Sequence, residues 1–379
     1  MNNNTSYDIA IIGGGLAGLC AAIHLGSHYK VLLIEKQVYP SHKVCGEYIS
    51  NEVLPYLLEL GIDPIKEGAK AIAKFEMSTH DGSLIKARLP LGGFGMSRYA
   101  LDKLLFEKAK TTCDTVQDTV IAVDLIESVA AAKIFQIQTK ASKSYTATYV
   151  LGAYGKRSNL DIHLKRDFIT KKSPWLGVKA HYELDIPDDV VALHNFRGGY
   201  CGVSQVENGI VNVCYLTTYK SFKEVGDIDM FQKEVLSKNK HLKRVFEEGR
   251  CLWEKPLTIS QISFNIKEPV KNHILMIGDS AGMIHPLAGN GMAMAIHSAS
   301  LVSEILIAHQ ISNPLHRENI EQSYRHSWNN QFKDRLRVGR IIQKLLLSPK
   351  ATKISLGVAK LFPRIVPAII KKTHGTAKK

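Results

Sequence analysis

Three glycines at the spacing of a dinucleotide-binding loop are the first residues in the chain whose pattern indicates chemistry. Gly13, Gly15 and Gly18 form a G-x-G-x-x-G run, with Gly14 between the first two. Such a loop turns tightly, lets backbone N–H groups approach a pyrophosphate, and places the phosphates at the N-terminus of the next helix. The pattern therefore predicts a nucleotide cofactor bound at the start of the chain.

A carboxylate follows at a position where this kind of fold can present it to a ribose. Glu35, with Lys36 beside it, ends the next apolar run, Val31 to Ile34. Its carboxylate can accept hydrogen bonds from the ribose diol, and an acid here disfavours a 2′-phosphate. The adenosine of either FAD or NAD fits these residues, so they leave both cofactors open.

A second glycine-rich region lies far downstream, where Gly278-Asp279 follows the apolar run 274–277. Together with the first loop, it resembles the second FAD signature of the aromatic-hydroxylase (class A flavin monooxygenase) and geranylgeranyl-reductase-like flavoproteins. The resemblance implies that Asp279 binds the ribityl chain of FAD. It also implies that the N-terminus of the next helix points at the flavin ring. A helix N-terminus stabilises negative charge, such as that of the anionic reduced flavin, by roughly 0.3 to 2 kcal/mol. The residues that open this helix are Gly289, Asn290, Gly291 and Met292.

Smaller matches extend the resemblance over nearly the whole chain. The run from Ser97 to Leu105 resembles the family's S-R-x-x-L/F-D helix, which implies that Arg98 lies near the FAD phosphates. Residues 152–158 resemble the hydroxylases' G-A-D-G-x-x-S segment, but Tyr154 replaces the aspartate. The stretch around Cys45 resembles the K-x-C-G sequence of the geranylgeranyl-reductase branch. Cys45 is therefore a candidate for contact with flavin or substrate, or else a small packing residue.

Two further residues are candidates for the chemistry. His285 precedes Pro286 in the loop that the resemblance places at the flavin, so it is either a proton donor or substrate ligand, or a histidine bonded to backbone. Tyr200 lies in the sheet that, by resemblance, roofs the substrate cavity. The tryptophans match no W-x-W-x-I-P halogenase element, which argues against halogenation; they are Trp175, Trp253 and Trp328.

The order of apolar runs predicts the elements that must position these residues. A buried strand, glycine loop, helix and second strand fill residues 7–35, and a hairpin is expected over 73–90. The predicted fold is α/β, with a Rossmann-type FAD-binding domain interleaved with an antiparallel substrate-binding sheet, plus C-terminal helices. The FAD-binding domain is assigned to 1–70, 96–165 and 267–330. The substrate-binding sheet is assigned to 71–95 and 166–266, and a basic amphipathic segment to 331–379.

Composition narrows the class of protein. With 379 residues, 45% of them hydrophobic, the chain has material for a large core. Its six cysteines are scattered without C-x-x-C or zinc spacing, so neither a disulfide framework nor a metal site is expected. The run from Ile9 to Tyr29 lacks charged residues, but its three consecutive glycines and missing basic flank argue against a membrane span or signal peptide. We expect the protein in the cytoplasm.

The positive charge is concentrated at the C-terminus. The formal charge is 49 − 35 = +14. Residues 331–379 hold 13 Lys and Arg against the single acid Asp334, or +12, which leaves 36 bases and 34 acids elsewhere. A nearly neutral body gives little support for nucleic-acid binding. The basic, apolar tail either contacts an anionic membrane surface or packs against the body.

These observations favour an FAD-dependent oxidoreductase. No second G-x-G-x-x-G is present, so electrons are expected from transiently bound NAD(P)H or from a partner protein. The preferred hypothesis is a monooxygenase that hydroxylates or epoxidises a large hydrophobic substrate (phenolic, polyketide or isoprenoid lipid) through a flavin hydroperoxide. The alternative is a flavin-dependent reductase of isoprenoid or lipid double bonds. A third and weaker hypothesis is an FAD-binding module without catalysis.

Overall fold

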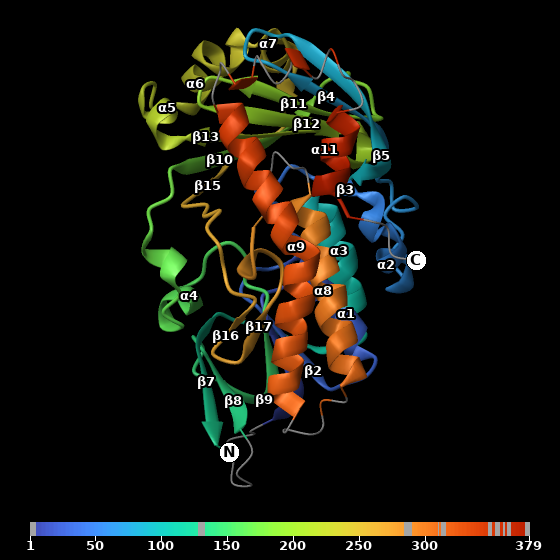
Figure 1. Cartoon of the computed structure of the whole chain (residues 1–379), viewed down its shortest axis with the longest axis vertical. Coiled ribbons are helices and arrows are strands. Elements are labelled where there is room, and N and C mark those ends of the chain that lie inside the picture. Colours follow the sequence, from blue (N-terminus) through green and yellow to red (C-terminus); the bar gives the residue numbers. More distant parts are fainter. Residues whose placement is uncertain are drawn as a thin grey trace.

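Two β-sheets and a set of covering helices make up the molecule (Figure 1). The computed structural model describes residues 5–127, 133–283, 290–309, 311, 316–347, 351–352, 357–358, 361 and 365–375. The fold is α/β, as predicted, with a parallel sheet and a second, mostly antiparallel sheet. The long helix α9 (Arg317–Leu347) runs beside both sheets.

In the first sheet, neighbouring strands follow the order β16-β17-β9-β1-β2-β6. Neighbours from β17 to β6 pair in parallel, which is typical of a nucleotide-binding sheet. An antiparallel hairpin, β7 and β8, extends from β9. The strands are β1 (Ser6–Ile12), β2 (Val31–Glu35), β6 (Asp114–Gln117), β7 (Val120–Glu127), β8 (Lys133–Thr139), β9 (Ser144–Gly152), β16 (Val270–Lys271) and β17 (Ile274–Met276).

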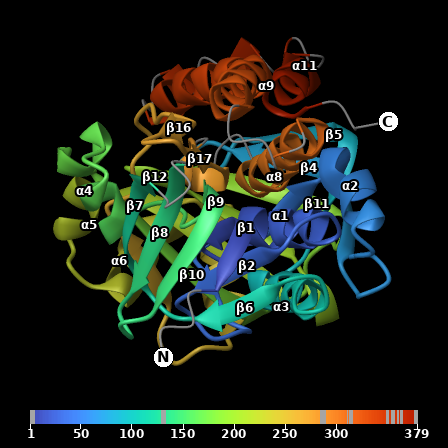
Figure 2. The same cartoon turned by 90° about the horizontal axis from the view of Figure 1, so that it is seen from below.

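Three helices cover one side of the parallel strands: α1 (Leu16–Gly26), α3 (Arg98–Ala109) and α8 (Gly291–Ala308). Figure 2 shows them together beside β1 and β2, with the β7–β8 hairpin on the other side. The uncharged run 9–29 is divided between β1 and α1 and is buried there. Among the described residues, α8 alone is long and apolar enough to cross a membrane, but it is 61% buried and packs between α1 and α9.

The second sheet has the order β14-β10-β13-β12-β11-β4-β5-β3, with β15 paired to β10. Its pairs are antiparallel except β11 with β4. The predicted hairpin over 73–90 is confirmed as β4 and β5. The strands are β3 (Tyr48–Ser50), β4 (Lys70–Ser78), β5 (Leu84–Gly95), β10 (Trp175–Glu183), β11 (Val190–Phe196), β12 (Gly199–Gln205), β13 (Val211–Thr218), β14 (Arg250–Cys251) and β15 (Leu257–Ser260).

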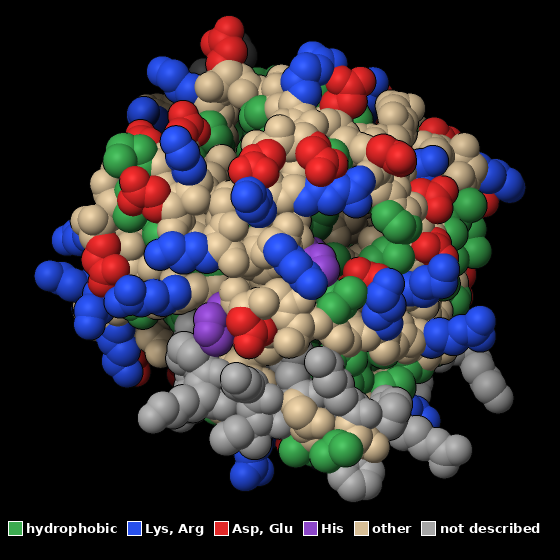
Figure 3. Space-filling model, turned by 90° about the horizontal axis from the view of Figure 1, so that it is seen from above, with side chains coloured by type: hydrophobic (Ala, Val, Ile, Leu, Met, Phe, Trp, Pro, Cys, Tyr) green, Lys and Arg blue, Asp and Glu red, His purple; other side chains and the backbone are tan. Residues whose placement is uncertain are grey.

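Three helices within the region that we expected to be strand-rich cover the outer face of the second sheet: α5 (Tyr219–Lys223), α6 (Ile228–Glu234) and α7 (Lys240–Glu248). The side chains of Asp227 and Asn239 cap the N-termini of α6 and α7. The inner faces of these two helices carry the buried residues Phe231, Leu242 and Val245. Because neither cap was used as a helix signal, these helices were not predicted from the sequence. The face seen in Figure 3 carries acidic and basic side chains interspersed, in agreement with the near balance of charge outside the tail.

The remaining helices are the C-terminal helices and several short helices that pack beside the two sheets. The long helix α9 begins at Arg317, ahead of the boundary at 331, and packs against α8. The strand β3 lies within the range 1–70 but pairs with β5 of the second sheet. The helix α11 packs against β5 and α9. The short helices are α2 (Leu54–Glu59), α4 (Asn159–His163) and α11 (Ile365–Thr373).

Candidate functional site

A cavity of about 1190 Å³ is lined by residues of both sheets and of the C-terminal helices. Its nucleotide end is lined by Gly13, Gly15, Glu35, Lys36 and Arg98. Its other end is mostly apolar, with Phe75, Met77, Leu193, Tyr200, Leu216 and Ile262. The volume exceeds the roughly 300 to 1,000 Å³ of common ligand sites. One cavity therefore has room for a dinucleotide and for a second molecule.

The glycine loop leaves the open space that a pyrophosphate requires. Gly13 has φ +105°, and a Cβ there would approach the carbonyl oxygen of Ala153 to 2.5 Å, so only glycine fits. At Gly15 a Cβ would find no atom nearer than Arg98 Nη2, at 3.8 Å. Gly18 is packed directly against the backbone of Gly13. The geometry at each glycine is compatible with the fingerprint: a tight turn at Gly13, open space at Gly15 and close helix packing at Gly18.

Glu35 ties the end of β2 to this loop. Its Oε2 accepts the Gly14 N–H at 2.5 Å, and its Oε1 accepts the Gln37 N–H at 2.8 Å. Both oxygens keep lone pairs that can accept hydrogen bonds from a ribose diol. The carboxylate therefore positions the loop as well as lining the cavity, together with Lys36.

Beside the loop, two cations share one buried carboxylate. Arg98 binds Asp102 through two hydrogen bonds of 2.8 Å, and Lys43 Nζ lies 2.7 Å from Asp102 Oδ2. Burial alone would raise the pKa of Asp102, but the charges of Arg98 and Lys43 outweigh burial and hold it below its usual value. The group carries one net positive charge, close to Gly15. This arrangement suits the phosphates of a dinucleotide.

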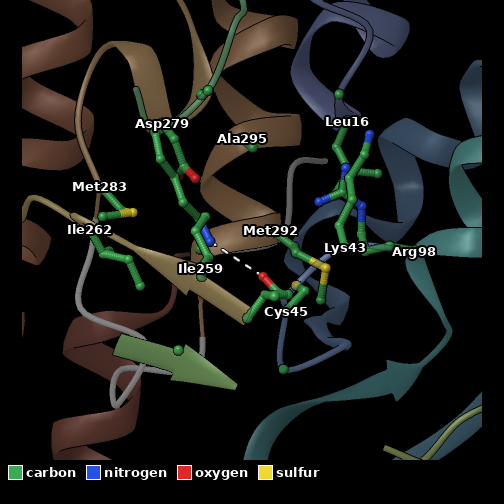
Figure 4. Close-up of a pocket in the computed structure, with 18 of the residues that line it drawn as sticks. Leu16, Lys43, Cys45, Arg98, Ile259, Ile262, Asp279, Met283, Met292 and Ala295 are labelled. Atoms are coloured by element: carbon green, nitrogen blue, oxygen red, sulfur yellow. Dashed lines mark hydrogen bonds between the residues drawn. The ribbon is translucent and has the colours of Figure 1, made fainter. Parts of the chain in front are cut away.

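Asp279 follows β17 and projects into the cavity opposite Cys45 and Met292 (Figure 4). Lys267 supports it from behind, donating from Nζ to the Asp279 carbonyl oxygen at 2.7 Å and to that of Lys156 at 3.0 Å. The Asp279 carboxylate has no hydrogen-bond partner among the residues the structure describes. It is therefore free to accept bonds from a polyol such as the ribityl chain.

The start of α8 is held by buried polar contacts rather than by its own cap. Asn290 Nδ2 donates to Glu52 Oε1 and to the Thr373 carbonyl oxygen, both at 2.9 Å. Arg335 of α9 lies 3.3 Å from the same Glu52 oxygen. Gly291 begins the helix and Met292 lines the cavity. The positive end of the α8 dipole thus faces the cavity, where negative charge is stabilised.

Cys45 lies half-buried in a loop, residues 42–47, that the second sheet holds firmly. Lys179 Nζ donates to the Lys43 carbonyl oxygen at 3.2 Å and forms a buried ion pair with Glu47. His181 Nε2 lies 2.8 Å from Glu47 Oε2, and Asn212 Nδ2 donates to the Cys45 carbonyl oxygen at 3.3 Å. The cavity wall at Cys45 is therefore rigidly placed.

Lys156 also reaches this loop, from the end of β9. Its Nζ donates to the Val44 carbonyl oxygen at 3.3 Å, and its side chain lines the cavity. The neighbouring Tyr154, which replaces the family's aspartate, lines the cavity and donates its hydroxyl to Met276 Sδ at 3.3 Å. This segment therefore contributes a cation and an apolar-facing ring, not a carboxylate.

The apolar end of the cavity is lined by only some of the apolar side chains of the second sheet. Tyr200 is buried, lines the cavity and packs with Leu216 and Ile262. Phe196, Val211 and Val213 instead pack in the core beneath α6 and α7. Strand alternation explains the division, because neighbouring side chains point to opposite faces. His285 and Gly289 lie outside the described residues.

Together, the fold and the cavity define a flavoprotein with a dinucleotide-binding sheet and a substrate-covering sheet, the architecture of class A flavin monooxygenases. The family model described as "FAD binding domain" matches residues 6–313. The chain therefore belongs to this FAD-binding family and is an FAD-dependent oxidoreductase. The open loop at Gly15, the adjacent cations and the Asp279 carboxylate, which accepts no hydrogen bond from the described residues, all fit FAD.

Relatives of known description are distant. A digeranylgeranylglycerophospholipid reductase of Methanococcus aeolicus is 22% identical over 373 residues, covering 90% of this chain and 88% of that protein. The FAD-dependent monooxygenase atnA of an Arthrinium species is 24% identical over 349 residues, covering 82% of this chain and 46% of that protein.

Solved structures agree in fold. PqsL, a probable FAD-dependent monooxygenase of Pseudomonas aeruginosa, has a TM-score of 0.73 at 16% identity, covering 92% of this chain and 98% of its own. The flavin-dependent brominase Bmp2 has a TM-score of 0.75 at 17% identity, covering 97% and 92%. At these identities the likeness shows the fold alone.

Several polar residues of the site were missed by the sequence analysis. Glu47, Lys179 and His181 meet beneath Cys45, and Glu52 meets Arg335 beside Asn290. These partners are far apart in sequence and stand in no spacing pattern. A glutamate that is buried in an ion pair cannot be recognised from the sequence, because the cation that pairs with it is known only from the structure.

Proposed function

We propose that this protein is a flavin-dependent monooxygenase that acts on a large apolar substrate and takes electrons from transiently bound NAD(P)H. The observation that supports this most is the continuity of the cavity. Gly15 and Asp279 line the same cavity as Tyr200 and Leu216. A cofactor held at the first two residues would share a largely apolar enclosure with whatever occupies the second end.

The residues of the chain have separable parts in this activity. Bound FAD supplies the two-electron and oxygen chemistry. Arg98 and Lys43 offset the phosphate charge, Asp279 accepts from the ribityl hydroxyls, and the start of α8 stabilises negative charge. The walls contributed by the second sheet and α11 exclude water, which protects reactive intermediates and strengthens electrostatic contacts.

A second candidate function is reduction of isoprenoid or lipid double bonds. Two observations favour it. The digeranylgeranylglycerophospholipid reductase matches this chain over most of both lengths. Cys45, which comes from the K-x-C-G stretch, lines the cavity. In this alternative the same apolar enclosure holds a polyprenyl chain, and oxygen takes no part in the turnover.

Oxygen dependence separates the two functions. The FAD-loaded protein is reduced with NADH, NADPH or dithionite and offered a panel of long phenols and polyprenyl alcohols, with and without oxygen. A product that gains one oxygen atom, only in air, supports the monooxygenase. A product that gains two hydrogen atoms without oxygen supports the reductase. Absence of both products across the panel would argue against an apolar substrate.

A further inference from the structure

Lys156 is a half-buried lysine in the wall of the cavity, in the segment that follows β9. Its Nζ donates to the Val44 carbonyl oxygen at 3.3 Å, and Val44 lines the cavity too. This is its one side-chain hydrogen bond to the residues that the structure describes, whereas an ammonium group can donate three. The side chain therefore keeps donors for a molecule bound in the cavity.

The contacts of Lys156 connect two walls of the cavity, between which Asp279 faces Cys45 (Figure 4). On the Asp279 side, Lys267 Nζ donates to the carbonyl oxygens of both Asp279 and Lys156, at 2.7 and 3.0 Å. On the opposite side, Lys156 Nζ reaches Val44, the residue before Cys45. A cofactor that is held by Asp279 and extends to the start of α8 would lie between these walls, beside the ammonium group.

The charge of Lys156 differs from that of neighbouring cations in having no carboxylate partner. Lys43, in the loop that Lys156 reaches, forms an ion pair with Asp102 at 2.7 Å. Lys179, which supports the same loop, forms a buried ion pair with Glu47. Lys156 forms no ion pair within the part of the chain that the structure describes. A half-buried charge without a partner favours an anion beside it.

We propose that Lys156 stabilises the reduced form of bound FAD over the oxidised form and thereby raises its reduction potential. Reduction adds two electrons and one proton to the neutral flavin ring, which leaves one negative charge on it. The phosphates carry charge in both forms and are expected near Gly15 and Arg98, so they do not distinguish the two. A contact shifts such an equilibrium only by its difference in strength between the two states.

The midpoint potential of the full-length, FAD-loaded protein tests this proposal, by equilibration with a redox dye of known potential. Lys156→Met removes the charge and keeps a stem of similar width. Loss of a charged contact predicts a change of about 10- to 100-fold in the reduction equilibrium. For a two-electron couple this is a shift of about 30 to 60 mV to more negative potential. An unchanged potential would overturn the proposal.

Further variants separate this role from a structural one. Lys156→Arg keeps the charge and should restore most of the potential. Lys172 is exposed, so Lys172→Met is the matched control and should leave the potential unaltered. Affinity for oxidised FAD should change little in Lys156→Met, because the oxidised ring is neutral. Equal losses of affinity for oxidised and reduced FAD would assign Lys156 to the phosphates and overturn the proposal.

The wild type provides a test that needs no variant. Its bound flavin should have a higher potential than free FAD, since Lys156 and the start of α8 both favour the anionic ring. A potential at or below that of free FAD would overturn the proposal even if Lys156→Met fails to fold. The proposal requires FAD but neither candidate reaction, so a result against the monooxygenase leaves it standing.

Discussion

The side-chain amide of Asn290 donates to the carbonyl oxygen of Thr373 at 2.9 Å, joining the first turn of α8 to the last turn of α11. The same amide donates to Glu52. The Glu52 carboxylate also forms an ion pair with Arg335 of α9 and accepts a hydrogen bond from the backbone N–H of Gly375. Three C-terminal elements thus meet at one buried carboxylate beside the cavity. The geometry of the flavin end and of the substrate wall is consequently linked.

Gly15→Val should abolish FAD binding while the protein still folds. The added Cβ meets no protein atom nearer than 3.8 Å, so the space it fills is that of the pyrophosphate. Flavin content after purification and circular dichroism measure the two effects. Gly18→Val is the contrasting variant, because its side chain would meet the backbone of Gly13 and should disrupt folding itself. Normal flavin content in Gly15→Val would contradict the assigned site.

Asp279→Ala should weaken FAD binding roughly 10- to 100-fold, since a charged acceptor is worth about 1.5 to 3 kcal/mol. Titration of the apoprotein with FAD measures the change. Asp229→Ala removes an exposed carboxylate on α6 and should leave the affinity unchanged. An unaltered affinity in Asp279→Ala would show that the ribityl chain is held elsewhere.

Glu47→Gln should destabilise the fold by about 3 to 5 kcal/mol, because Lys179 would keep a buried charge without its partner. Urea denaturation measures this. Glu183→Gln breaks an exposed pair with Arg250 and should cost at most about 1 kcal/mol. Equal losses in the two variants would contradict the buried-pair interpretation.

Acid should destabilise the fold through protonation of Glu47. Burial by itself raises the pKa of Glu47, but the hydrogen bond from His181 and the charge of Lys179 outweigh it and hold the pKa below 4.5. A carboxyl with a lowered folded-state pKa stabilises the fold above its unfolded-state pKa, and this is lost as pH falls through the folded-state value. Wild type should therefore lose stability below about pH 4.5 more steeply than Glu47→Gln.

Lys267 should make stability rise in mild base. Burial lowers its pKa from 10.5 to about 8. Between these values the unfolded chain binds more protons than the folded one, so stability increases with pH. At about 1.4 kcal/mol per pKa unit, wild type should gain roughly 2 to 3 kcal/mol relative to Lys267→Met between pH 7 and 10. Other titrating groups cancel in this difference. A difference independent of pH would refute it.

We propose that the C-terminal segment contacts anionic membranes. Leu361 is 76% exposed and Ile369 42% exposed, next to the exposed Lys371 and Lys372. At about 1 kcal/mol per lysine, replacing both by glutamine should reduce partitioning to anionic vesicles about 30-fold, as measured by co-sedimentation. The same replacement at Lys220 and Lys223 of α5 is the control for net charge. Failure of the wild type to sediment with such vesicles would end the proposal.

Local patterns predicted the parallel sheet well, because each of its signals lies within a few residues. The glycine loop, the apolar strand before it and Glu35 together specify one strand-helix-strand unit. The pairing of Glu47 with Lys179 has no such signal, since it depends on how two sheets meet. The position of α11 in the cavity wall was undetermined for the same reason: its apolar residues fit a membrane or a protein surface equally well.

The position of α11 has a consequence for how the protein is made. The cavity begins at Gly13, near the start of the chain, and one of its walls contains His374. Chains emerge from the ribosome N-terminal end first, at about 5 to 20 residues per second. The phosphate-binding loop can therefore form long before the wall that encloses it. We therefore expect completion of the cavity wall to be a late step of biogenesis, after α11 has been released from the exit tunnel.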